Sequence, residues 1–225
     1  MLFEPKFEDR REAGIVLGRQ LSEFANRDDV IVLALPRGGV PVGYEVAKIL
    51  AAPMDVFVVR KLGVPGREEF AFGAIASGGI RVLNEDIVRV LRLPDDLVAR
   101  VAALEGIELE RREKSFRGDR PPPDVENKIV ILVDDGLATG ATMRAAVKAL
   151  KTQHPRQIVV GVPVASRQAC EEFKEPNDVW SVCSITPEPF YGVGMWYRDF
   201  RQTTDEEVKA VLAAARSDLS KAAQP

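Results

Sequence analysis

The residues best suited to chemistry lie in one short stretch, where two adjacent carboxylates, Asp134 and Asp135, are followed by small and hydroxyl-bearing residues. The apolar run at residues 129–133 predicts a buried strand just before them, and a helix is expected to begin near Thr142. A helix N-terminus offers free N–H groups and roughly half a positive charge, so it suits a phosphate group. The neighbouring carboxylates are natural acceptors for the hydroxyls of an attached sugar. The stretch therefore predicts a sugar phosphate site at the carboxyl end of a strand.

The spacing argues against two other phosphate-binding motifs. A Walker A loop needs a lysine after its last glycine, but Gly140 is followed by Ala141. The gap between Gly38 and Gly43 fits that motif, but Tyr44 stands where the lysine belongs. No G-x-G-x-x-G opens a predicted helix, which disfavours a dinucleotide site. An Asp-Asp-Gly turn that merely caps a helix is the remaining alternative.

Residues 130–142 resemble the signature of the type I phosphoribosyltransferase family, in which four apolar residues and two acids precede a small-residue turn and Thr-Gly-x-Thr. The resemblance implies that Asp134 and Asp135 hold the ribose hydroxyls and act in catalysis. It also implies a Mg²⁺ ion, which the two acids would reach indirectly or through those hydroxyls. The 5-phosphate would lie on the turn and the start of the helix. The substrate-binding residues there are Gly136, Ala138, Thr139, Gly140, Ala141 and Thr142.

A second candidate loop, Pro36-Arg37-Gly38-Gly39, follows the apolar run at residues 30–35. The two glycines free two N–H groups in a tight turn, and the guanidinium of Arg37 suits a diphosphate. Adjacent parallel strands would bring this loop and the first to one sheet edge. The loop is similar to the pyrophosphate loop of the family, especially in its xanthine/guanine salvage branch, and this likeness implies a cis peptide bond entering Arg37. An ordinary strand–helix turn is the alternative.

Arg60 and Lys61 close the next predicted strand, and a third cation, Arg67, lies in the loop beyond it. Cations near a diphosphate could stabilise the charge that builds on the leaving group. Arg60 and Lys61 therefore join Arg37 as catalytic candidates, and the family's mobile catalytic loop lies in this region. A solvated basic loop is the alternative, and the sequence leaves open which cation matters.

Aromatic residues are concentrated at residues 190–200, although they make up only 7% of the whole chain. Trp196 could stack on a flat heterocycle and Asp199 could accept a hydrogen bond from it, so both are substrate-binding candidates. A hydrophobic plug or a subunit contact is the alternative. Purine salvage relatives often carry a lysine after the strand expected at residues 157–163, where this chain offers Arg167 nearby. The chain also resembles, over most of its length, a less characterised bacterial group with the same Arg-Gly-Gly and Trp-Tyr-x-Asp-Phe patterns.

The elements that must position these residues follow from hydrophobic periodicity and turn signals. Strand, helix and strand between residues 30 and 60 form a βαβ unit, which predicts a parallel sheet. We expect an α/β fold with an open, mostly parallel sheet flanked by helices. A single domain would span residues 1–225, with a core at about 28–184 and a C-terminal hood and helix at about 185–220. The other expected elements are helices at 9–26, 85–91, 95–116, 168–173 and 207–219, a strand at 55–60, a loop at 61–73, a hairpin over 71–76 and 80–83, and a strand at 179–184.

Composition narrows the setting of the protein. The 225 residues include 31 Lys and Arg against 34 Asp and Glu, a net charge of −3 that argues against a broad nucleic-acid footprint. The N-terminus lacks the apolar segment of a signal peptide, and no apolar run approaches the roughly 18 residues of a membrane span. Cys170 and Cys183 fit no metal or redox spacing. We therefore expect two unpaired thiols in a cytoplasmic protein without membrane or nucleic-acid partners.

The resemblance to the family implies a phosphoribosyltransferase that moves ribose 5-phosphate from 5-phosphoribosyl 1-pyrophosphate to a nitrogenous base in nucleotide salvage. Family likeness adds Mg²⁺ as cofactor and a homodimer. One alternative is a non-catalytic regulatory protein of the same fold that binds phosphoribosyl diphosphate or a nucleotide. Others are a phosphohydrolase or nucleotide-binding protein that uses Asp134 and Asp135 for metal, and an interaction protein whose site is empty.

Overall fold

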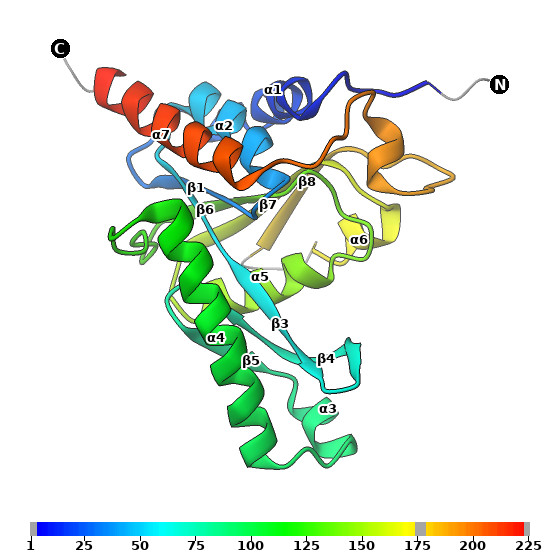
Figure 1. Cartoon of the computed structure of the whole chain (residues 1–225). Coiled ribbons are helices and arrows are strands. Elements are labelled where there is room, and N and C mark those ends of the chain that lie inside the picture. Colours follow the sequence, from blue (N-terminus) through cyan, green and yellow to red (C-terminus); the bar gives the residue numbers. More distant parts are fainter. Residues whose placement is uncertain (1–3, 174–178, 223–225) are drawn as a thin grey trace.

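The computed structural model describes residues 4–173 and 179–222 and divides the strands between two sheets (Figure 1). The larger sheet has five strands in the order β2-β1-β6-β7-β8, and every neighbouring pair is parallel. This confirms the predicted open parallel sheet flanked by helices. Its strands are β1 (Val30–Ala34), β2 (Met54–Val56), β6 (Ile129–Val133), β7 (Gln157–Val164) and β8 (Val179–Ile185). None of the described helices is both long and apolar enough to span a membrane.

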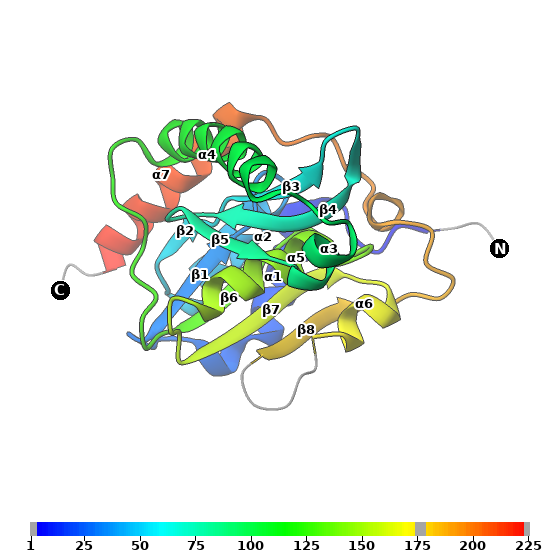
Figure 2. The same cartoon turned by 90° about the horizontal axis from the view of Figure 1, so that it is seen from below.

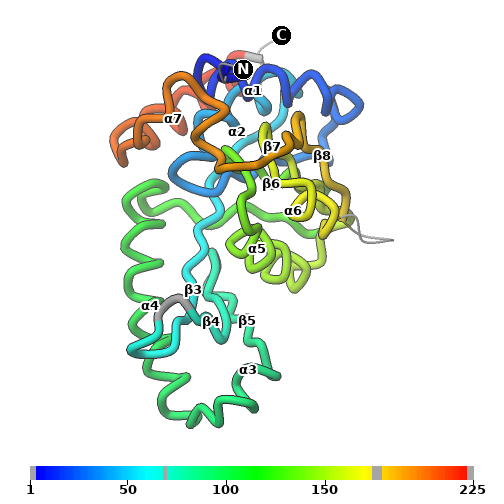
Figure 3. Tube along the Cα trace, turned by 90° about the vertical axis from the view of Figure 1, so that its right-hand side faces the viewer, coloured from blue at the N-terminus to red at the C-terminus, as the bar shows by residue number. Residues whose placement is uncertain are grey.

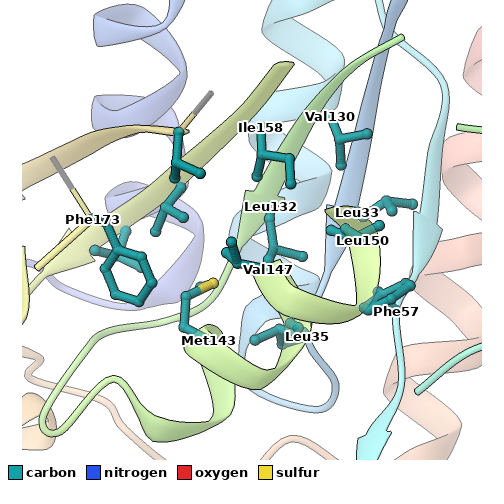
Figure 4. Close-up of a cluster of buried hydrophobic side chains, with 14 of the residues drawn as sticks. Leu33, Leu35, Phe57, Val130, Leu132, Met143, Val147, Leu150, Ile158 and Phe173 are labelled. Atoms are coloured by element: carbon teal, nitrogen blue, oxygen red, sulfur yellow. The ribbon is translucent and has the colours of Figure 1, made fainter. Parts of the chain in front are cut away.

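Helices cover both faces of this sheet because its central strands are apolar on both sides. All five residues of β1 and of β6 are buried. Leu33 and Leu132 face helix α5 (Ala141–Lys151), whose side chains Met143, Val147 and Leu150 fill that side (Figure 4). The alternate residues of β1 and β6 pack against α1 (Arg10–Gln20) and α2 (Gly39–Leu50) on the opposite face. The packing fixes β1 and β6 side by side, so their carboxyl ends form one edge.

The smaller sheet is an antiparallel insertion of β3 (Val59–Val64), β4 (Arg67–Ala76) and β5 (Ile80–Leu83). It is followed by α3 (Glu85–Val90) and the long helix α4 (Asp95–Arg117). Figure 3 shows this insertion beyond α5, on the side of the sheet opposite α1 and α2. The predicted hairpin and both predicted helices are therefore confirmed.

Two predictions for residues 55–73 are wrong. The strand expected at 55–60 is interrupted, because β2 ends at Val56 and the chain leaves the parallel sheet there. The backbone N–H of Val58 already donates to the Ser77 hydroxyl at 2.8 Å, which starts the pairing with β4. The loop expected at 61–73 is mostly strand. Its glycines and charges suggested a loop, but a partly exposed antiparallel sheet accommodates charged residues on its outer faces.

The register of the insertion decides which way its cations point. Lys61 pairs with Ala74, which pairs with Val82, and this row faces α5. Arg60 pairs with Ile75, and these alternate positions face α4. Figure 2 shows the inserted sheet lying across α5 with α4 on its other side. Consecutive cations on β3 are thus sent to opposite faces of the sheet.

The C-terminal part of the chain returns to the first half of the molecule. The short helix α6 (Arg167–Glu171) lies between β7 and β8 in the sequence. Residues 186–204, which we call the hood, connect β8 to helix α7 (Asp205–Ala222). A capping box opens this helix, since the Thr204 hydroxyl accepts from the Glu207 N–H while the Glu207 carboxylate accepts from the Thr204 N–H. Helix α7 packs against α2 and α4.

The prediction of two unpaired thiols is wrong, because Cys170 and Cys183 form a disulfide. Cys170 lies on α6 and Cys183 on β8, 13 residues apart. Helix α6 packs beside β8, which brings the two side chains together, a proximity that sequence spacing alone did not indicate. The disulfide ties α6 to the edge strand of the parallel sheet.

Candidate active site

The predicted phosphate turn lies open at the carboxyl edge of the parallel sheet. Strand β6 ends at Val133 and α5 begins at Ala141, one residue earlier than expected. Gly140 has a φ of 67°, which favours glycine, and Thr139 and Thr142 are exposed. The Thr139 hydroxyl accepts from the Ala141 N–H at 3.5 Å. A cradle of main-chain amides at a helix N-terminus is therefore accessible from solvent.

The cradle is supported from behind by the segment between β7 and α6. The Leu137 N–H donates to the Val164 carbonyl at 2.8 Å, and the Ser166 N–H donates to the Leu137 carbonyl at 3.0 Å. The Ser166 hydroxyl also caps α6 through the Ala169 N–H and donates to the Ala138 carbonyl. The turn is thus held by the strand beside it.

The two carboxylates lie where β6 meets this turn, and their surroundings raise the pKa of both. Burial raises the pKa of Asp134 well above its usual range, and the neighbouring charge of Asp135 raises it further. Burial also raises the pKa of Asp135, although the Arg10 guanidinium acts in the opposite direction. The pair is therefore short of positive charge and of donors. Ribose hydroxyls or a cation would supply them.

The Arg-Gly-Gly loop touches the cradle directly, as predicted for adjacent strands. The peptide bond between Pro36 and Arg37 is cis, which confirms the expectation for this loop. A methyl group on Gly38 would lie 2.0 Å from the Asp135 carboxylate, and one on Gly39 would lie 2.7 Å from the Val133 carbonyl. Both glycines are needed because the loops are in close contact.

The predicted cations around this edge have different surroundings. Arg37 is half-exposed, and its guanidinium lies 3.6 Å from the Asp205 carboxylate at the start of α7. Arg60 donates to Glu105 on α4 at 2.7 Å and points away from the cradle helix. Lys61 is exposed and lines a groove whose far wall is α5, beginning at Ala141. Of the two strand cations, the structure brings Lys61 towards the cradle and Arg60 away from it.

Arg10, on the N-terminal helix, is a residue that the sequence did not indicate. Its Nε donates to Asp135 Oδ2 at 2.8 Å, and its guanidinium lies 4.0 Å from the centroid of the Phe200 ring. Tyr197 also reaches the same acid, because its hydroxyl donates to the Asp135 carbonyl at 2.6 Å. Burial raises the pKa of Tyr197, so the phenol keeps its proton. These residues are distant in sequence, and neither periodicity nor motif spacing links them.

The hood places its predicted base-binding residues unevenly. Trp196 is buried in a cluster with Phe7 and Tyr197, and Asp199 accepts from the guanidinium of Arg201. Val193 lies close to Gly136 at the start of the cradle turn. A methyl group added to Gly136 would come within 2.5 Å of the Val193 side chain. An aliphatic hood residue therefore lies against the start of the cradle turn. The substrate-binding roles of Trp196 and Asp199 stay predictions.

Comparisons with known proteins agree with this geometry. Residues 11–197 match the sequence family described as the phosphoribosyl transferase domain. A Mycobacterium tuberculosis protein provisionally named a phosphoribosyl transferase is 44% identical over 216 residues, which are 96% of this chain and 48% of that protein. The chain thus spans about half the length of the curated relatives it matches.

Solved structures show the same architecture. TT1426 from Thermus thermophilus is 41% identical, with a TM-score of 0.81 over 93% of this chain and 98% of that one. A hypothetical protein from Neisseria gonorrhoeae, crystallised with bound ppGpp, shares the fold at 15% identity, with a TM-score of 0.50 over 94% and 95% of the two chains.

Proposed function

Because the chain belongs to the phosphoribosyl transferase family, we propose that it transfers ribose 5-phosphate from 5-phosphoribosyl 1-pyrophosphate to a nitrogenous base and releases diphosphate. The observation that carries this proposal is the open cradle at the N-terminus of α5, with two carboxylates on one side and the Arg-Gly-Gly loop against them. Phosphate, ribose and diphosphate each have a matching group within one sheet edge.

The cradle binds the 5-phosphate and so places the sugar over the acids. The amides that follow Gly140 and the hydroxyls of Thr139 and Thr142 donate to the phosphate oxygens. Asp134 and Asp135 accept from the ribose hydroxyls, which fixes the sugar ring for attack at C1. Much of the catalytic effect is then orientation, because the donor is held in one geometry.

The diphosphate end of the donor lies on the Arg-Gly-Gly loop. The Gly38 N–H and the guanidinium of Arg37 bind the leaving group as negative charge builds on it, whereas the Gly39 N–H already donates to the Leu35 carbonyl at 3.0 Å. Lys61 supplies further positive charge from the inserted sheet, a role better suited to it than to Arg60, which is engaged with Glu105. A ring nitrogen of the base attacks C1 as the bond to diphosphate breaks; the electron pair of that bond leaves with diphosphate, and the proton of the attacking N–H is released to solvent.

Mg²⁺ suits the donor set at this edge. Two adjacent carboxylates with raised pKa values offer hard oxygen ligands that lack positive charge. Such an ion needs only one or two protein carboxylates and takes its other ligands from water and substrate phosphates. Asp134 and Asp135 would hold it indirectly or through the ribose hydroxyls, and it would neutralise charge on the diphosphate when bound.

The acceptor enters from the hood side, where Val193 lies against Gly136 and the aromatic segment follows. A nitrogenous heterocycle matches the apolar contact of Val193 and the planar groups around it. We retain a homodimer, a cytoplasmic location and a role in nucleotide salvage as parts of the proposal.

The experiment is a screen of nucleobases with phosphoribosyl diphosphate and Mg²⁺, read by thermal shift, diphosphate release and mass spectrometry of the products. We expect a melting shift with phosphoribosyl diphosphate and one base that yields diphosphate and a nucleoside monophosphate. The Thr139→Glu variant, which puts a negative charge in the cradle, is the control and should show neither. A melting shift without turnover for any base would favour the non-catalytic alternative. Release of phosphate from simple esters would favour a hydrolase.

A further inference from the structure

Arg10 has three separate contacts at the edge of the candidate site, and its side chain is only 11% exposed. Its Nε donates to Asp135 Oδ2 at 2.8 Å, and its Nη1 donates to the Arg201 carbonyl at 2.7 Å. Its guanidinium lies over the Phe200 ring at 4.0 Å from the centroid. Contacts from three directions fix the plane of the guanidinium, so the hydrogen bond to Asp135 has one geometry.

The Phe200 ring is itself held by the hood. It stacks on Tyr197 with ring centroids 5.0 Å apart, and Tyr197 packs on Phe7 at 5.6 Å. The Tyr197 hydroxyl donates to the Asp135 carbonyl. Asp135 therefore accepts hydrogen bonds at its main chain from Tyr197 and at its side chain from Arg10. Both of these residues also contact the Phe200 ring.

These two hydrogen bonds leave one carboxylate oxygen of Asp135 available for a ligand. Oδ2 accepts from Arg10 and lies against the backbone of Gly38. In the described part of the chain, Oδ1 has no hydrogen-bond partner. A carboxylate held through one oxygen cannot rotate freely, so its second oxygen is presented in a fixed direction. We propose that Arg10 is a positioning residue that aims Asp135 Oδ1 at the ribose hydroxyls, an inference that rests on the proposed function.

Of the three residues that hold Asp135 in this way, two lie outside the residues matched by the family. That match covers residues 11–197, so Arg10 and Phe200 lie just beyond its two ends. One residue of the N-terminal helix and one residue of the hood thus meet over one acid of the shared motif. A lysine in place of Arg10 would keep the charge but lose the planar fork and the stacking.

The test compares two probes that differ only in the sugar. Ribose 5-phosphate engages the cradle and the acids, whereas inorganic phosphate engages the cradle alone. Both are titrated calorimetrically into the full chain, its Arg10→Met and Arg10→Lys variants, and Arg11→Met. Arg11 is the matched control, since it lies next along the same helix and pairs with Glu45 at 3.0 Å instead of with Asp135.

We expect Arg10→Met to weaken ribose 5-phosphate binding by about five- to twentyfold, as for the loss of a charge-assisted hydrogen bond, and to leave inorganic phosphate binding unchanged. Arg10→Lys should fall between, and Arg11→Met should bind both probes as the parent does. Equal ribose 5-phosphate affinity in Arg10→Met and the parent overturns the positioning role, as does an equal loss for both probes. If the parent binds inorganic phosphate but gains nothing from ribose, the ribose site of the proposed function fails instead. Melting temperatures of all variants separate unfolding from these outcomes.

Discussion

The five-stranded parallel sheet and the inserted three-stranded sheet present charged residues in opposite ways. In the parallel sheet, β1 and β6 are buried throughout, and the candidate site lies on the loops at their carboxyl ends. In the insertion, charges stand on the strands, and the register sends Arg60 and Lys61 to opposite faces. A fully buried strand positions its loop by main-chain packing, whereas a half-exposed strand positions single side chains through its pairing.

Among the changes that test this contrast between the two sheets, removing one carboxylate of the candidate site should have the largest effect. We expect Asp135→Asn to lower kcat by about 10³-fold, because its charge and its orienting hydrogen bonds act on the reacting sugar. The amide cannot pair with Arg10 as the carboxylate does. Steady-state diphosphate release measures the change. Asp96→Asn, on exposed α4 beside Arg100, is the control and should leave kcat within about twofold. Comparable turnover in Asp135→Asn and the parent would contradict the assigned role.

A backbone change should be nearly as damaging where the two loops meet. In Gly38→Ala the new methyl would lie 2.0 Å from an Asp135 carboxylate that Arg10 holds in place. Displacing that group by about 1 Å should cost about 10²-fold in kcat/KM. Gly106→Ala, on α4 in the insertion, places its methyl 3.5 Å from Ile75 and should leave kinetics unaltered. If both glycine variants behave alike, the close contact of the loops is unimportant.

The disulfide tests whether support behind the cradle matters to the parallel sheet. Replacing Cys170 and Cys183 by serine should lower the free energy of unfolding by about 2–3 kcal/mol, the entropy expected for a closed loop of this size. Chemical denaturation with and without reductant measures the loss. Reductant should destabilise the parent by a similar amount and leave the double serine variant unaffected. A parent protein that is insensitive to reductant would show that the bridge contributes nothing.

Much of the parallel sheet could be predicted from the sequence because its signals are local. The apolar runs of β1 and β6, the glycines after them and the Thr-Gly-x-Thr turn each identify their own element. Even the capping box of α7 follows from residues 204 and 207 alone. The cradle and the Arg-Gly-Gly loop were therefore found, and their contact followed from strand adjacency.

The contacts that could not be predicted depend on tertiary closure. Arg10 meets Asp135 only because α1 packs on the sheet and the hood returns over it, a separation of 125 residues. The disulfide requires α6 and β8 to be placed first. The strand residues within 61–73 were mistaken for a loop because glycine and charge are common to loops and to exposed antiparallel strands.

The smallest effect concerns the two neighbouring cations of β3, and it tests the register argument most directly. Lys61→Met should lower kcat by about five- to tenfold, because a lysine facing the groove beside Ala141 stabilises the leaving diphosphate. Arg60→Met removes an ion pair with Glu105 whose side chains are 29% and 28% exposed, so its effect should fall mainly on stability and stay below about 1 kcal/mol.

The comparison between these two variants is informative because they differ by one residue on one strand. Diphosphate release gives kcat for both, and chemical denaturation gives the free energy of unfolding. A larger kinetic loss for Arg60→Met would reverse the assignment, since the face turned towards α4 would then carry the catalytic cation. Equal losses would mean that strand register does not separate the two roles, and that the inserted sheet acts through its overall positive charge, as a solvated basic segment would.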